Sequence, residues 1–169
     1  TTPTLIWSPS GNMTLPKTIE VPNGWEKTLS PIFAQQNPSG YIVGVKDPQY
    51  LKIKNSILNN KLPTESSPRT STDKTATVWV KDNMILSKNG DVTTNVIEPL
   101  QTIRNVDFYK NRSDAIIFST GDNIYVVEID KEGTQNFIPI YVGSKPDFVN
   151  ADVNFIYVLN GPTLLQVAI

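Results

Sequence analysis

The stretch that decides the fold is Val106 to Ile129, which reads VDFYKNRSDAIIFSTGDNIYVVEI. Moved forward by 40 residues without a gap, it falls on Pro146 to Ile169, PDFVNADVNFIYVLNGPTLLQVAI. Apolar positions match between the copies, and six residues are identical: Asp107 and Asp147, Phe108 and Phe148, Ile116 and Ile156, Gly121 and Gly161, Val127 and Val167, Ile129 and Ile169. Units of about 40 residues built from several short strands are typical of β-propeller blades.

The strands within the repeat favour a propeller over a β-sandwich. The segments AIIFS and NIYVVEI, and their counterparts FIYVL and TLLQV, are apolar at consecutive positions and do not alternate cleanly. A strand of this kind needs cover on both faces, which a propeller blade receives from its two neighbours. A β-sandwich buries one face of each sheet and shows stricter alternation.

We therefore predict an all-β fold, a β-propeller of four-stranded antiparallel blades in one domain over residues 1–169. The pattern gives about 4–5 blades of roughly 40 residues, at residues 5–29, 30–62, 63–102, 103–143 and 144–169. The last blade ends after its third strand. Because an exposed apolar edge promotes aggregation, we expect the N-terminal strand, Thr1 to Trp7, or a partner chain to complete it.

Turn signals and β-rich runs locate the elements inside the blades. Asn89-Gly90 indicates a hairpin, and the Val-Lys-Asp that ends both YIVGVKD and TVWVKDN indicates a solvated hairpin tip. Pro63 to Thr75, rich in Ser, Thr and Pro, is expected to be an exposed loop, either tolerated or a binding loop on one rim. The predicted strands are Tyr41–Val45, Tyr50–Ile53, Thr77–Val80, Met84–Ser87, Val92–Ile97, Ile103–Tyr109, Ala115–Ser119, Asn123–Ile129 and Asn136–Val142.

Composition argues against several functions. The 15 basic and 16 acidic residues leave a net charge of -1, so no strong field favours nucleic acid or an anionic membrane surface. The chain has no cysteine and no histidine. It therefore lacks disulfides, thiol chemistry, the commonest zinc ligand and every Ser-His or Cys-His catalytic pair. We expect no cofactor and no metal.

The C-terminal half resembles a known family. Ile103 to Gly161, with its strand DNIYVVEID and its KPDF motif, is similar to the TolB-like propeller region that follows PEGA domains in bacterial surface proteins. Ile6 to Gly11, IWSPSG, resembles the Trp-Ser-Pro-Asp-Gly turn of TolB-type blades, with serine in place of the aspartate. The resemblance implies an extracytoplasmic, non-enzymatic domain at the cell surface. It also implies an anchor in a segment that this chain lacks, and a start at Thr1 instead of Met fits a processed or shortened chain.

The candidate binding residues lie where the pattern predicts a rim. Trp25, beside Asn23-Gly24, is a candidate aromatic contact. Tyr109, Lys110 and Arg112 form a polar, aromatic cluster between two strands, where propellers carry ligands or where a solvated loop stands.

Two further residue types have competing interpretations. Trp79 is expected in the core, although it could join an aromatic platform with Trp7 and Trp25. Asp107 and Asp147 recur at equivalent positions. They either accept backbone hydrogens at a turn or ring a central channel and bind a cation.

Three functions follow from these residues. The first is a non-catalytic propeller that binds a protein or a surface polymer through one rim. The second is a truncated or engineered propeller piece that assembles with copies of itself as a homo-oligomer. The third is a carboxylate-dependent enzyme of the glycosidase type, which needs two carboxylates about 5–10 Å apart and one raised pKa, a pair that the spacing here does not offer.

Overall fold

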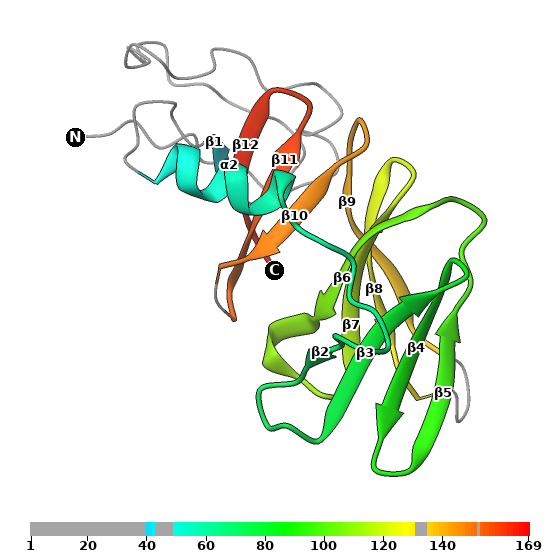
Figure 1. Ribbon diagram of the computed structural model, residues 1–169. Coiled ribbons are helices and arrows are strands. Elements are labelled where there is room, and N and C mark those ends of the chain that lie inside the picture. Colours follow the sequence, from blue (N-terminus) through cyan, green and yellow to red (C-terminus); the bar gives the residue numbers. More distant parts are fainter. Residues whose placement is uncertain (1–39, 43–48, 131–134, 152) are drawn as a thin grey trace, which may run out of the picture. The chain divides into compact units, whose positions relative to one another are not determined.

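The computed structural model describes residues 40–42, 49–130, 135–151 and 153–169, with the side chains of 40–42 left out (Figure 1). These residues form antiparallel four-stranded sheets and one α-helix, so the all-β prediction is confirmed at this level. The chain divides into two compact units. The central unit is residues 60–140, and the terminal unit is residues 1–59 with 141–169.

Three hairpins of one construction carry the 40-residue repeat. They are β3 (Ala76–Lys81) with β4 (Met84–Asn89), β7 (Ala115–Thr120) with β8 (Asn123–Glu128), and β11 (Phe155–Asn160) with β12 (Thr163–Ala168). In the second hairpin Ala115 pairs with Glu128. Forty residues on, Phe155 pairs with Ala168. The sequence repeat is therefore a repeat of strand register.

The backbone conformation of each two-residue turn is one that its residues adopt readily. Gly121 and Gly161, the first turn residues of the second and third hairpins, have φ of 52° and 57°. Asp82 and Asn83, the tip of the first hairpin, both have positive φ, 49° and 61°. Hairpin turns need positive φ at these places, and Gly, Asn and Asp adopt it at least cost. The predicted Lys-Asp tip is confirmed at Lys81-Asp82, while its first copy, Lys46-Asp47, lies outside the described residues. The Asn89-Gly90 turn, with Gly90 at φ 57°, is also confirmed.

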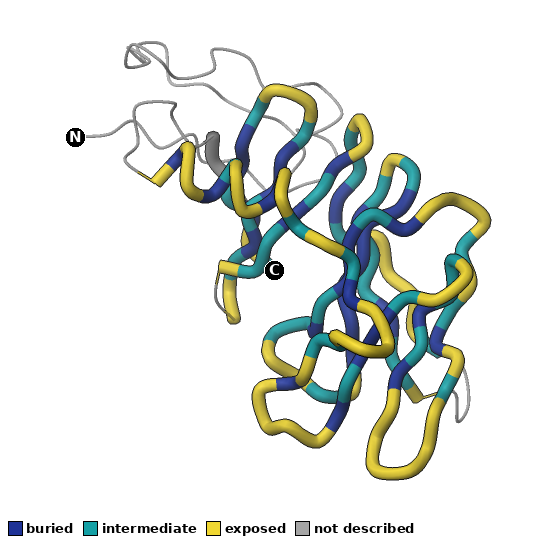
Figure 2. Tube along the Cα trace, viewed as in Figure 1, coloured by how far each residue is buried: buried dark blue, intermediate teal, exposed yellow. Residues whose placement is uncertain are grey.

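Two four-stranded sheets pack together in the central unit. One has the order β2 (Arg69–Thr70), β3, β4, β5 (Val92–Ile97), and the other β6 (Ile103–Phe108), β7, β8, β9 (Phe137–Val142), with the unit boundary inside β9. Their shared core contains Val78 and Ile85 from the first sheet and Val106 and Phe118 from the second, all fully buried. Figure 2 shows buried stretches in dark blue along the strands of both sheets. Burial of each such side chain stabilises the fold by roughly 1.5–3 kcal/mol.

The first strands of the two repeat copies differ in register. In the central unit Phe108 pairs with Ile116. In the terminal unit Phe148, on β10 (Asp147–Asn150), pairs with Val158, two residues beyond the position that the repeat implies. An even offset keeps the same side chains on the same face of the sheet, and both phenylalanines are buried. The difference lies in the 3₁₀ turn η1 (Tyr109–Asn111), which ends β6 early because Lys110 and Asn111 have positive φ.

A strand from earlier in the chain completes the sheet of the terminal unit. The sheet order is β1 (Gly40–Ile42), β12, β11, β10, and Tyr41 is paired with Gln166 on β12. The sequence predicts that an N-terminal strand closes this sheet, but it places that strand at Thr1 to Trp7. Those residues lie outside the described part of the chain. Tyr41 and Ile42 of the predicted strand Tyr41–Val45 belong to β1, and residues 43–45 lie outside the described residues.

The predicted strand Tyr50–Ile53 is wrong, because this segment begins an α-helix, α2 (Tyr50–Leu58). Its buried residues are Tyr50, Ile53 and Ile57, which are three and four positions apart and therefore share one helical face. That face packs against Leu159 and Leu164 of the terminal sheet. Asn59 caps the C-terminal end of the helix, and its backbone N–H donates to the carbonyl of Asn55.

The predicted loop Pro63 to Thr75 is partly wrong, because Arg69 and Thr70 form β2 and pair with β3. Hydrogen bonds order the remainder. The Ser71 hydroxyl, 3% exposed, donates to Asp73, as do the backbone N–H and the hydroxyl of Thr75. These bonds, led by that from Ser71, hold the pKa of the Asp73 carboxyl well below its usual value. Hydrogen bonds between polar groups, and not the burial of apolar side chains, therefore order this part of the segment.

Candidate functional site

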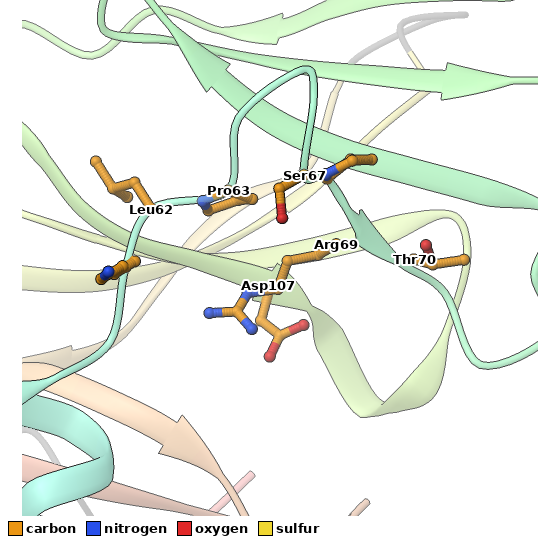
Figure 3. Close-up of a pocket in the computed structure, with 8 residues that line it drawn as sticks. Leu62, Pro63, Ser67, Arg69, Thr70 and Asp107 are labelled. Atoms are coloured by element: carbon orange, nitrogen blue, oxygen red, sulfur yellow. The ribbon is translucent and has the colours of Figure 1, made fainter.

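A groove lies in the central unit where β2 approaches β6. It has a volume of about 340 Å³ and is called here the Arg69 groove; its lining residues are Lys61, Leu62, Pro63, Ser67, Pro68, Arg69, Thr70 and Asp107. Figure 3 shows the side chains of Arg69 and Asp107 beside one another in this view of the groove. Each comes from the first strand of its sheet in the order along the chain. The groove thus combines a guanidinium, an ammonium, a carboxylate and two hydroxyls.

Hydrogen bonds on one side fix the half-buried Arg69. Its Nε donates to the backbone carbonyl of Val106 on β6 over 3.2 Å, and its Nη2 donates to the Oδ1 of Asn60. The amide of Asn60 in turn donates to Oδ1 of Asn105, a buried residue of β6, over 2.6 Å. A guanidinium held in this way loses little further conformational freedom when it binds a ligand.

The other edge of the same guanidinium has donors to spare. Arg69 carries five N–H groups, and its two hydrogen bonds to other described residues use Nε and one N–H of Nη2. The end of the fork, formed by Nη1 and the second N–H of Nη2, makes no hydrogen bond to the described part of the chain. This edge has the spacing that binds a carboxylate through two parallel bonds.

The other donors of the groove are also uncommitted. Among the described residues, Lys61 has no ion-pair partner, and the hydroxyls of Ser67 and Thr70 make no hydrogen bond. All three side chains are exposed. The groove therefore offers several donors to an acceptor-rich ligand without first breaking internal bonds.

Asp107 has a defined backbone contact. Its Oδ1 accepts the backbone N–H of Phe108 over 2.8 Å, and Asp147 accepts that of Phe148 over the same distance. The recurring aspartate is thus a backbone acceptor, as the first of its two interpretations predicts. No group of three or more carboxylate, histidine or cysteine side chains that could hold a metal ion occurs among the described residues.

The predicted rim residues occupy η1 and the residue after it, outside the Arg69 groove. Lys110 Nζ lies 5.4 Å from the ring centroid of Tyr109. Arg112 binds Asp114 through two bonds of 2.7 and 2.6 Å, and both side chains are more than half exposed. This bond, above all, lowers the pKa of Asp114 and raises that of Arg112. The guanidinium of Arg112 is therefore paired with a carboxylate, whereas the acceptors of Arg69 are a neutral amide and a backbone carbonyl. Trp25 lies outside the described residues.

Trp79 is buried, as expected, with 6% of its surface exposed. It lines a second hollow, of about 470 Å³, together with residues that include Leu86 and Lys88. Its indole Nε1 is buried and finds no hydrogen-bond acceptor among the described residues. Because this N–H is inaccessible to solvent, it is not available as a donor to a ligand in the hollow.

Sequence reasoning found Asp107 but missed Arg69, Lys61 and Asn60. Arg69 stands in a segment that reads as a polar loop, and its partners are 9 and 37 residues away in the chain. The available signal was an arginine flanked by Pro68 and Thr70 just before a strong strand.

A comparison with protein-family models, with curated proteins and with solved structures gives no match to this chain. No helix in the described ranges has the length and apolar character that crossing a bilayer requires. The groove and the sheets must therefore be interpreted from their own chemistry.

Proposed function

We propose that the protein is a non-catalytic binding module of the propeller type, and that it holds its ligand in the Arg69 groove. In this proposal the four-stranded sheets are blades, and β2 and β6 are the strands nearest the propeller axis. The observation that carries the proposal is an arginine fixed between the first strands of two consecutive sheets, with one edge of its fork open toward a groove. The TolB-like resemblance adds an extracytoplasmic location at the cell surface.

The chemistry of the carboxyl groups favours binding over catalysis. A glycosidase needs a general acid whose pKa is raised. In Asp73 and Asp114 hydrogen bonds lower the pKa instead. The Arg69 groove contains one carboxylate, Asp107, where a glycosidase needs two.

The terminal sheet favours a module that works as a single chain over a fragment that assembles by exchanging strands. The edge of β12 is paired with β1 of the same chain over three residues. This edge therefore does not require a second copy to cover it.

Nuclear magnetic resonance titration tests the proposal. Isotope-labelled protein is titrated with a panel of peptides and oligosaccharides, and the chemical-shift changes are mapped onto the sequence. A ligand of the module shifts signals of residues 61–70 and 107, and Arg69→Gln weakens its binding. Arg112→Gln is the matched control, because it removes an exposed arginine outside the groove. Turnover of a ligand, or binding that ignores Arg69, overturns the proposal.

A further inference from the structure

From the chemistry of the Arg69 groove we infer that its ligand is a uronic acid residue of an acidic polysaccharide, with the sugar carboxylate bound end-on by Arg69. This inference rests on the proposed function and names its ligand. It follows from the charge of the groove, its pattern of hydrogen-bond donors, its size and the length of β2.

The charge of the groove fits a single negative charge. Lys61 and Arg69 are positive and Asp107 is negative, which leaves one net positive charge in the lining. A carboxylate balances it. A phosphate monoester with two negative charges exceeds it, and Asp107 repels such a phosphate more strongly than it repels a carboxylate.

The geometry of Arg69 fits a planar, two-oxygen acceptor. Asn60 and the carbonyl of Val106 occupy the Nε side of the fork, so the free end presents two parallel N–H groups. A carboxylate matches two such donors with two oxygens. Lysine at the same place supplies the charge without the fork.

The remaining groups fit hydroxyls around that carboxylate. The hydroxyls of Ser67 and Thr70 can each donate and accept a hydrogen bond, and the carboxylate of Asp107 accepts. The ring hydroxyls of a sugar both donate and accept, so they can meet all three groups. An acidic peptide side chain brings only methylene groups beside its carboxylate.

Size and strand length favour a sugar over a peptide. The groove, at about 340 Å³, is at the small end of binding pockets, which span roughly 300–1,000 Å³, and one sugar residue fits there. A peptide could bind instead by adding a strand to the sheet edge at β2. However, β2 has only two residues, which limits the backbone bonds that such a strand can form.

Calorimetric titration of the full chain tests the inference with three probes. They are an oligogalacturonate, the same oligosaccharide with its carboxyls methyl-esterified, and an oligoglutamate peptide. We expect the acidic sugar to bind, salt to weaken its binding, and esterification to weaken it by about tenfold or more, since hydrogen bonds to a charged group are lost. Arg69→Lys should cause a similar loss, and Arg112→Lys should leave binding unchanged.

Two further variants guard against misfolding of the Arg69 variant. Lys61→Gln and Thr70→Val alter exposed side chains that make no hydrogen bond to other described residues, and each should weaken acidic-sugar binding several-fold. Equal binding of the esterified sugar overturns the inference, and so does indifference to all three groove variants. If the peptide or the neutral sugar binds with dependence on Arg69 and the acidic sugar does not, the inference fails while the proposed function stands. If none of the three probes binds, the inference fails; the proposed function fails as well if no ligand of the wider panel shifts the resonance signals of residues 61–70 and 107.

Discussion

Truncation of Ile116 and of Ile156 to alanine tests whether the repeat is structural throughout. Both side chains are completely buried. They hold equivalent hairpin positions, since Ile116 pairs with Val127 and Ile156 with Val167. Replacing a buried isoleucine with alanine removes three carbon atoms and leaves a cavity, which costs roughly 2–5 kcal/mol of unfolding free energy. We expect each variant to lose an amount in this range and the milder Ile→Val variants to lose about 0.5–1.5 kcal/mol.

The assay is urea unfolding followed by far-ultraviolet circular dichroism, at one pH and one protein concentration. Val92→Ala serves as the control, because Val92 is 67% exposed and its truncation should cost less than about 0.5 kcal/mol. The reasoning fails if Ile116→Ala or Ile156→Ala unfolds at the same urea concentration as this control. A large loss at one position with none at the other would contradict the equivalence of the two hairpins.

Three further predictions address the turns, the acid response and the closing strand. Gly161→Ala should lower the free energy of unfolding by roughly 1–2 kcal/mol because φ is 57°; no atom lies within 4 Å of an added Cβ, so the cost comes from the backbone conformation alone. Gly161→Asn should lower it by less, and equal urea midpoints for the two variants would contradict this. Hydrogen bonds lower the folded-state pKa of Asp73 below 3.8, so its stabilisation is present above about pH 4 and is lost as the pH falls further; the stability advantage of the wild type over Asp73→Asn should shrink between about pH 6 and pH 2.5, and a constant difference would refute it. The pair Tyr41→Cys and Gln166→Cys, in a chain without other cysteines, should form a disulfide within one monomer, seen by mass spectrometry, because the two residues are register partners; disulfide-linked dimers alone would favour strand exchange between copies.

The hairpins could be predicted because local sequence determines them. Each combines two six-residue strands with a turn whose residues accept positive φ, as at Gly121 and Gly161. Those signals lie within about 14 residues of one another, a distance over which turn chemistry and strand propensity decide the structure.

The helix α2 was missed because its apolar residues were interpreted over too short a window. Tyr50 and Ile53 alone fit a short strand, whereas Tyr50, Ile53 and Ile57 together have the helical spacing of the buried face. Similarly, the polar segment that contains β2 has no apolar pattern of its own. Its order comes from pairing with β3 and from the Ser71–Asp73 bonds.

The candidate site was predicted in part. The recurrence of Asp107 and Asp147 directed attention to the first strands, and both accept a backbone N–H there. The role of Arg69 depends on Asn60 and on the carbonyl of Val106, which become neighbours only when the strands assemble. Arg112 is a predicted rim residue, but the charge of its guanidinium is already paired with Asp114, two positions away.

A crystal structure of the protein with bound oligogalacturonate tests the central claim most directly. The account predicts a sugar carboxylate in the Arg69 groove, with its oxygens at roughly 2.7–2.9 Å from Nη1 and Nη2 of Arg69. Sugar density on another face, with the groove of Arg69 and Asp107 filled by solvent alone, would contradict it.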